Sequence, residues 1–262
     1  MIPLARRDGR PLRIGHRGAA ALAPENTLES FRAGVAAGVD LVEFDVLRLR
    51  GGELVVAHSY DLNEVSHGAQ RGTLRSMHFA EIRAVCPDLP TLDDALGFFA
   101  AEAPETGVHV DLKSRKAGEE VSAAVDRFGL RERTIVSSFH HHALRRLASV
   151  APGLRLGVSF PRDRLGVDRR LGFRPVVGTG LRVLRVATPR LVDVLLRRSR
   201  ANTLVLHHAL VSASVVACAH ERGVPVVAWT VDNERDLERV DGAGVDAIVT
   251  NNPSIFVSTL TT

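Results

Sequence analysis

The sequence predicts an α/β protein of the (β/α)8, or TIM barrel, class, folded as a single domain over residues 1–262. Short apolar runs alternate strictly with longer amphipathic stretches, which is typical of parallel β/α architecture. Eight such strand–helix units within 262 residues match a closed barrel. Because no low-complexity linker divides the chain, we expect one domain.

A doubly wound open sheet is the alternative that the same alternation allows. That fold normally carries a glycine-rich dinucleotide loop after its first strand. The segment GHRGAAALAP, residues 15–24, lacks the G-x-G-x-x-G spacing. The barrel is therefore favoured.

The first unit consists of a strand in LRIGHRG (12–18) and a helix in ENTLESFRAGVAAG (25–38). Apolar residues recur at helical spacing in the second segment. Asn26 and Thr27 are candidate caps, and Gly38 is a candidate stop. The second strand, VDLVEFDVLRL (39–49), turns at two glycines into ELVVAH (53–58), which predicts a short hairpin-like extension after strand two.

The other units follow a polar loop. A helix over 91–103 has Thr91 as its predicted N-cap, and Pro189 is placed in the first turn of a later helix. The alternating strands and helices are expected at 107–113, 118–129, 133–139, 140–150, 154–160, 188–200, 202–208, 212–223, 224–231, 233–244, 246–252 and 253–260.

Composition excludes several classes of protein. The net charge is +4, but the arginines are dispersed apart from a local excess over 162–200, and one Trp and one Tyr cannot form an aromatic nucleic-acid surface. No segment resembles a signal peptide or a membrane span, so no stable membrane insertion is expected. Cys86 and Cys218 show no disulfide or metal-ligand pattern, which favours a reducing, cytoplasmic location.

Carboxylates fall on one face of two neighbouring strands. Strand periodicity is two, so Glu43 and Asp45 share a face, as do His109, Asp111 and Lys113. These faces are expected to meet at the barrel mouth, where such folds place their chemistry. Close carboxylates repel one another unless a cation compensates, and Mg²⁺ and Ca²⁺ prefer oxygen ligands. Glu43, Asp45 and Asp111 are therefore predicted to bind one divalent cation, Mg²⁺ or Ca²⁺.

The alternative for the acidic residues is an ordinary cluster of ion pairs with Lys113 or Arg17. Two histidines, His16 and His58, also end apolar runs, and they fit an acid/base pair flanking the carboxylates. Arg17 and Lys113 would supply positive charge for an anionic substrate. A cation, two imidazoles and two basic side chains at one mouth suit phosphodiester cleavage.

The motif GHRG…PENTLESFRAGVAAGVDLVEFDVLRLRGGELVVAHS resembles the N-terminal signature of the glycerophosphodiester phosphodiesterases, and the similarity continues through VDLK, SSF, VVAWTVDN and GVDAIVTNNP. The resemblance implies a TIM barrel, one divalent metal, and hydrolysis of a small-molecule glycerophosphodiester to glycerol 3-phosphate and an alcohol. It further implies the following roles: His16 and His58 as acid and base, Glu43, Asp45 and Asp111 as metal ligands, Arg17 and Lys113 as phosphate contacts, Phe139 and Trp229 as the lining of the glycerol end, and Asn26 as an orienting residue or a simple cap.

Among the departures of the sequence from this pattern, two concern residues at or beside the candidate site. Ser59 stands where the family usually has aspartate after the second histidine, and Asp61 is the nearby substitute. Asp111 stands where glutamate is usual. A phosphate- or lipid-headgroup-binding barrel with weakened catalysis and a lysophospholipase D-like enzyme are therefore alternatives. The motifs leave open which histidine is the acid, the leaving alcohol and the oligomeric state.

Two further groups of histidines are weaker candidates. His140, His141 and His142 are consecutive at a helix start, where side chains diverge, so a rim position is favoured over a metal cluster. His207 and His208 end a strand, so that one of them could face the mouth.

Overall fold

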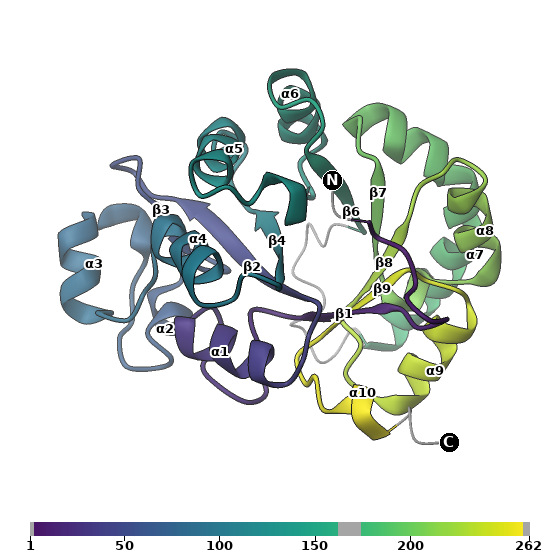
Figure 1. The fold of residues 1–262 in the computed structure, drawn as a ribbon, viewed down its shortest axis with the longest axis horizontal. Coiled ribbons are helices and arrows are strands. Elements are labelled where there is room, and N and C mark those ends of the chain that lie inside the picture. Colours follow the sequence, from purple (N-terminus) through teal and green to yellow (C-terminus); the bar gives the residue numbers. More distant parts are fainter. Residues whose placement is uncertain (1–2, 162–173, 259–262) are drawn as a thin grey trace.

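A computed structural model, which describes residues 3–161 and 174–258, confirms the predicted barrel. Eight parallel strands form a closed ring in the order β1-β9-β8-β7-β6-β5-β4-β2, and the pairing of Ile14 with Leu41 joins β1 to β2. Figure 1 shows helices surrounding this ring. The strands are β1 Leu12–Gly15, β2 Leu41–Arg48, β4 Gly107–Leu112, β5 Thr134–Ser138, β6 Arg155–Phe160, β7 Thr203–His207, β8 Val226–Trp229 and β9 Ala247–Thr250.

Helices follow the barrel strands, as the alternation predicts. Thr27 caps α1 through Ser30 N, and Thr91 caps α4 through Asp94 N, so both side chains satisfy amides that the first helical turn leaves free. The expected end of the closing helix at residues 259 and 260 lies outside the described residues. The outer helices are α1 Leu28–Ala36, α4 Leu92–Ala101, α5 Gly118–Arg127, α6 His141–Val150, α7 Arg174–Ser199, α8 Ala213–His220, α9 Glu234–Gly242 and α10 Ile255–Ser258.

Two cores result from the alternation of side chains along the strands. One set packs against the helices and forms the large outer core, which includes Phe31, Phe44 and Phe99. The other set fills the barrel interior with Leu12, Ile14, Leu41, Ile135, Val205, Val227, Ala247 and Val249. Because the interior is filled with side chains, polar groups that point inward can gather only near its ends.

The glycines of the GHRG motif are required by close approaches of the backbone. A Cβ at Gly15 would lie 2.0 Å from the carbonyl oxygen of Gly18, and a Cβ at Gly18 would lie 2.3 Å from Ser30 Oγ on α1. Gly18 also has φ +93°, a conformation that side chains rarely adopt. The two glycines thus let the chain turn sharply around His16 and Arg17 while α1 packs against it.

The hairpin-like extension is present, but it carries helices that the sequence analysis assigned to a polar loop. Strand β3 (Leu54–Val56) pairs antiparallel with β2. It is followed by α2 (Leu62–Val65), the 3-10 turn η1 (Leu74–Ser76) and α3 (Phe79–Val85). These short elements share a small core of their own, formed by Leu47, Leu49, Val55, Ala57, Leu62, Leu74, Ile82, Cys86 and Leu89. Their helical periods are too short to stand out in the sequence.

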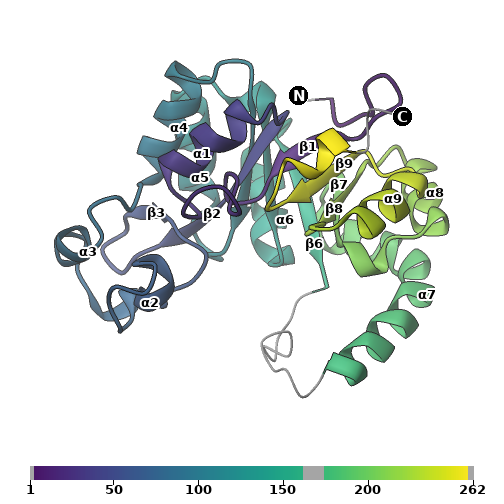
Figure 2. The ribbon, with the colours of Figure 1, turned by 90° about the horizontal axis from the view of Figure 1, so that it is seen from below.

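The prediction for Pro189 is wrong. Helix α7 begins at Arg174, so Pro189 lies inside the helix and not in its first turn. A proline often marks the first turn of a helix, but it can also occur inside a long helix at the loss of one backbone hydrogen bond. Figure 2 shows α2 and the first turns of α7 extending beyond the barrel on the side toward which β6 points.

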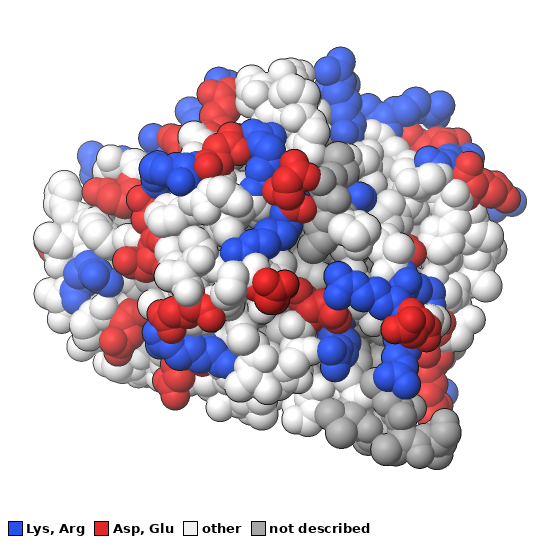
Figure 3. Space-filling view, in the orientation of Figure 1, with Lys and Arg blue, Asp and Glu red and all other residues white. Residues whose placement is uncertain are grey.

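Charged side chains of both signs are interspersed on the face shown in Figure 3. Lys and Arg lie among Asp and Glu there, as expected for a solvated outer face. Across the described ranges, no helix is both long enough and apolar enough to cross a lipid bilayer.

Candidate active site

Three buried carboxylates meet at one end of the barrel. Glu43 and Asp45 lie on β2 and Asp111 on β4, and the register places Asp45 directly beside Asp111. One oxygen from each residue lies within 4.8 Å of the other two. The structure therefore brings together the three acidic residues that strand periodicity placed on matching faces.

The charges of this cluster are only partly balanced. Burial and the carboxylates of Asp45 and Asp111 raise the pKa of Glu43 well above its usual range. Burial alone would also raise the pKa of Asp45, but Lys113 and Arg17 outweigh it and lower that pKa. Mutual repulsion of this kind is relieved by a further positive charge.

One oxygen of the cluster has an incomplete set of partners. Asp45 Oδ1 is buried and forms an ion pair with Lys113 Nζ at 2.7 Å. The geometry of this contact is not that of a hydrogen bond, and no hydrogen bond from the described residues reaches that oxygen. A carboxylate oxygen can bind a hard cation without meeting the angular requirements of a hydrogen bond. The oxygen-only donor set and this oxygen fit Mg²⁺ or Ca²⁺.

Asn26 holds Asp45 from the first loop. Its Nδ2 donates to Asp45 Oδ2 at 3.0 Å, and its Oδ1 accepts the backbone N–H of Asp45 at 3.1 Å. Thr27, not Asn26, caps α1. Of the two interpretations given for Asn26, the structure favours the orienting one, because both ends of its amide contact Asp45.

His16 lies at the end of β1 and belongs to a chain of three side chains. Asn251 Nδ2 donates to Asp232 Oδ2 at 2.7 Å, so the amide oxygen of Asn251 faces His16 Nδ1, which lies 2.7 Å away. His16 must therefore carry its proton on Nδ1. Burial and Arg17 lower the pKa of His16 to about 4. At neutral pH its Nε2, 3.9 Å from Glu43 Oε2, is thus an unprotonated nitrogen beside the cluster.

His58 contacts a carboxylate, whereas His16 contacts an amide. The Nδ1 of His58 lies 2.5 Å from Glu64 Oε1, and Ser59 Oγ donates to the other oxygen of Glu64 at 2.9 Å. The hydrogen bond from His58 lowers the pKa of Glu64 to about 2, so a negative charge faces the ring at neutral pH. The carboxylate that contacts His58 is thus Glu64, whereas the side chain of Asp61 caps α2 through Asn63 N.

Arg17 connects the acidic cluster to the loop before α1. Its backbone N–H donates to Glu43 Oε2 at 2.9 Å, and its side chain contacts Glu25 Oε1 at 2.6 Å and Asp45 Oδ2 at 3.1 Å. Its φ of +49° is the left-handed conformation that a non-glycine residue seldom adopts. The Arg17 side chain as a whole is 16% exposed. A guanidinium fixed in this way can bind an oxyanion.

An aromatic wall borders the other side of the cluster. The rings of Phe139 and Trp229 meet edge to face at 5.7 Å, and Lys113 Nζ lies 5.9 Å from the Phe139 ring. His207 packs on Trp229 at 5.2 Å. His208 packs on His207 at 4.5 Å and contacts Asp236 on α9, so it lies behind His207 relative to Trp229 in this series of contacts.

A cavity of about 620 Å³ lies between the first loop and the β3–α3 extension. Its lining includes the polar residues Asn26, His58 and Glu64 and apolar residues such as Val56 and Leu89. Neither Phe139 nor Trp229 lines it. The cavity and the aromatic wall are therefore two separate surfaces next to the site.

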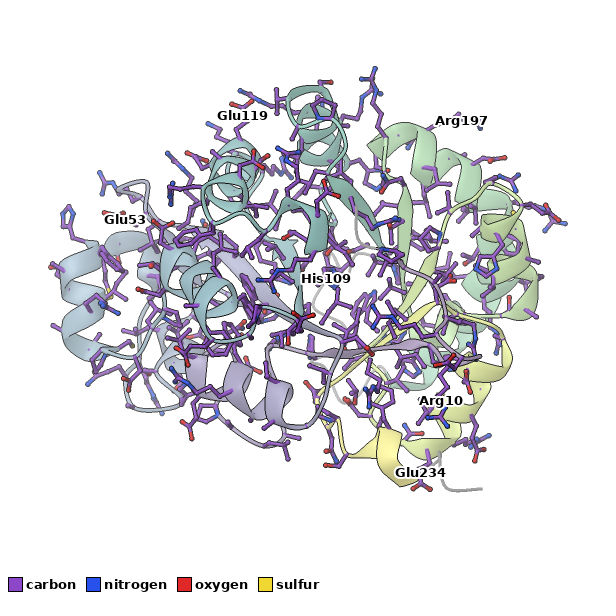
Figure 4. All side chains as sticks on the ribbon, in the orientation of Figure 1. Arg10, Glu53, His109, Glu119, Arg197 and Glu234 are labelled. Carbon is purple, nitrogen blue, oxygen red and sulfur yellow. The ribbon has the colours of Figure 1, made fainter. Side chains whose placement is uncertain are left out.

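His109 lies deeper in the barrel. Figure 4 places it near the centre of the ring of strands, far from labelled peripheral residues such as Glu119 and Arg197. It is 2% exposed, and burial lowers its pKa from 6.5 to about 4. Protonation therefore favours the unfolded chain at pH values between these two pKa values.

This difference predicts acid sensitivity of the metal-free protein. Below about pH 6.5 the unfolded state binds a proton on His109 that the folded state refuses until about pH 4, so stability is lost as the pH falls, by up to about 3 kcal/mol. Urea unfolding of wild type and His109→Gln at pH 7 and pH 4.5 measures this. We expect the free energy of unfolding to fall less with pH in His109→Gln. His142→Gln, which changes an exposed histidine, should keep the wild-type slope; an unchanged slope in His109→Gln would contradict the prediction.

Sequence reasoning missed Glu64, Asn251 and Asp232. Glu64 lies in a segment read as loop, so no strand or helix period marked it. Asn251 and Asp232 stood within segments quoted for the family resemblance, but without a role. Their contact with His16 joins residues 235 positions apart, which local pattern cannot show.

Comparisons with known proteins show the family and the fold of the chain. A sequence model described as the glycerophosphoryl diester phosphodiesterase family matches residues 16–255. A glycerophosphodiester phosphodiesterase of Caldanaerobacter subterraneus is 25% identical over 94% of this chain and 96% of its own length. A crystal structure assigned as a glycerophosphoryl diester phosphodiesterase from Silicibacter pomeroyi has a TM-score of 0.78 and 27% identity, covering 98% of this chain and 96% of that one. An Oleispira antarctica phosphodiesterase, solved with its product sn-glycerol-3-phosphate, shares the fold at a TM-score of 0.72 and 21% identity, covering 96% and 97% of the two chains.

Proposed function

The chain belongs to the glycerophosphoryl diester phosphodiesterase family, and from this premise we propose that it hydrolyses glycerophosphodiesters to glycerol 3-phosphate and an alcohol. The observation that supports the proposal is a cluster of three converging carboxylates with two histidines near enough to influence Asp45 electrostatically, one of them bonded to an amide oxygen and the other to an anionic glutamate. Residues 1–262 are proposed to act as one such domain.

One divalent cation, Mg²⁺ or Ca²⁺, is proposed to bind Glu43, Asp45 and Asp111. When bound, it would supply Lewis-acid stabilisation of the negative charge that develops on the phosphoryl oxygens. The three carboxylates would determine the position of the cation. Asn26 keeps Asp45 in place through its two hydrogen bonds.

His16 is proposed as the general base. Asn251 holds the Nδ1 proton, so Nε2 is the nitrogen that can take a proton from the attacking group, either water or the neighbouring glycerol hydroxyl. The ring is unprotonated at neutral pH because its pKa lies at about 4. Asp232 and Asn251 act through His16, as positioning residues that select this tautomer.

His58 is proposed as the general acid. As the bond between phosphorus and the leaving oxygen breaks, Nε2–H donates its proton to that oxygen, while Nδ1 keeps its hydrogen bond to Glu64. Glu64, which is anionic at neutral pH, accepts the hydrogen bond from Nδ1–H and so orients the ring. Because His58 lines the side cavity, the leaving alcohol is proposed to enter there.

Arg17 and Lys113 are proposed to bind the phosphate, and Phe139 and Trp229 the glycerol carbons. Both basic groups stand beside the cluster, with Lys113 between the carboxylates and the aromatic wall. A cytoplasmic location is also proposed, which rests on the two free cysteines.

The test is hydrolysis of a panel of glycerophosphodiesters and lysophospholipids with added metal and with chelator. We expect metal-dependent release of glycerol 3-phosphate from glycerophosphodiesters. Release only from lysophospholipids would indicate the lysophospholipase D-like alternative. Binding of the panel without turnover would indicate a headgroup-binding barrel and would contradict the proposed hydrolysis.

A further inference from the structure

Asp111 is the end of a buried hydrogen-bond chain that the proposed reaction does not use. Ser137 Oγ lies 2.8 Å from Asp111 Oδ1, and His109 Nε2 lies 2.9 Å from Ser137 Oγ. The three residues are 7%, 1% and 2% exposed, in the order Asp111, Ser137 and His109. Because a carboxylate only accepts, the serine hydroxyl donates to Asp111, and His109 Nε2–H donates to the serine.

This chain and Lys113 together hold both oxygens of Asp111. Lys113 Nζ lies 2.5 Å from Oδ2, so the carboxylate is bonded on both sides. The strand register sets Ser137 beside Asp111 on one side and beside Gly157 on the other. A Cβ at Gly157 would lie 3.1 Å from Ser137 Cβ, so Gly157 leaves room for the serine at a tightly packed place.

We infer that Ser137, itself oriented by His109, is a positioning residue that fixes the Asp111 carboxylate for cation binding. The inference rests on the proposed function, because it concerns the cation proposed for Glu43, Asp45 and Asp111. Without the hydroxyl, Asp111 Oδ1 loses its buried donor. Of the two side chains that hold the carboxylate, only Lys113 on Oδ2 then remains, so the orientation of Oδ1 toward a cation is no longer fixed.

The test compares Ser137→Ala with a matched control, Ser138→Ala. Both changes remove one buried hydroxyl from β5, but Ser138 Oγ donates to the backbone oxygen of Leu112 and not to a carboxylate. Titration calorimetry with Mg²⁺ and with Ca²⁺ measures the dissociation constant, and a thermal melt in chelator measures the stability of each variant. We expect about 10–100-fold weaker cation binding in Ser137→Ala and wild-type binding in Ser138→Ala.

Further variants keep the inference testable if Ser137→Ala does not fold. Ser137→Thr keeps the hydroxyl and should retain cation affinity. His109→Gln keeps a donor toward Ser137, whereas His109→Leu removes it and should weaken binding. Wild-type affinity in both Ser137→Ala and His109→Leu would overturn this inference alone. A wild-type protein that binds neither cation would overturn the proposed metal site and this inference with it.

Discussion

Replacing His16 or His58 by alanine is expected to lower the turnover number by about 10²–10⁴-fold, because this is the usual contribution of a general acid or base. Arg17→Ala is expected to act mainly on substrate and transition-state binding, since it removes positive charge and not a proton carrier. Turnover number, KM and melting temperature should be measured together for the three variants. Near wild-type turnover in both histidine variants would leave the two strand ends as ordinary surface.

The two histidine variants should differ in how they depend on the leaving group. A phenolic leaving group of low pKa needs little protonation, so the loss caused by His58→Ala should shrink with such a substrate. The loss caused by His16→Ala should stay the same, because activation of the attacking group is still required. The reverse pattern would exchange the proposed roles of the two residues.

His220 offers a control that separates stability from catalysis. It contacts Asp246 Oδ2 at 2.8 Å, and the same oxygen accepts the N–H of Val226 at the start of β8. This pair lies at the end of the barrel opposite to the site. His220→Ala should therefore lower the melting temperature while the turnover number stays close to wild type.

Removal of the divalent cation is expected to lower hydrolysis by an amount comparable to the loss of either histidine. Lewis-acid stabilisation contributes several kcal/mol, so chelation should lower hydrolysis by about 10³-fold or more, and added Mg²⁺ or Ca²⁺ should restore it. Asp45→Asn should reproduce the loss without chelator, because it takes a charged ligand from a buried site. Activity assays and elemental analysis of the chelated protein together measure this effect.

Asp93→Asn is the matched control for Asp45→Asn. It makes the same chemical change at an exposed residue of α4, whose partner is Arg127 on α5. We expect wild-type activity and wild-type metal dependence in this variant. Full activity of the wild-type protein after exhaustive chelation, with no metal left by analysis, would refute the metal site.

The alternation of strands and helices was predictable because it depends on local sequence. Each barrel strand is an apolar run, and each outer helix has its own period and, in α1 and α4, a threonine cap. The helices of the β3–α3 extension were not predictable in the same way. They are short, and they are stabilised by a separate core. The residues of this core are spread along the chain between Leu47 and Leu89.

Pattern also placed the three carboxylates correctly relative to one another. Glu43 and Asp45 are two residues apart on one strand, so the pleat alone puts them on the same face. Asp111 joins them because β4 pairs with β2 in the register that sets Asp45 beside Asp111. Periodicity predicted which face each residue takes, whereas the register decided which residues touch.

The sequence by itself determined the fold class, the order of the units and the side chains that point into the mouth. Only the tertiary structure decided the partners that give those side chains their chemistry: Asn251 and Asp232 for His16, Glu64 for His58, and Ser137 for Asp111. The physical reason is the range of each interaction. A side chain's face depends on backbone geometry over two residues, but closure of the barrel is what brings β9 beside β1 and so sets Asn251 against His16.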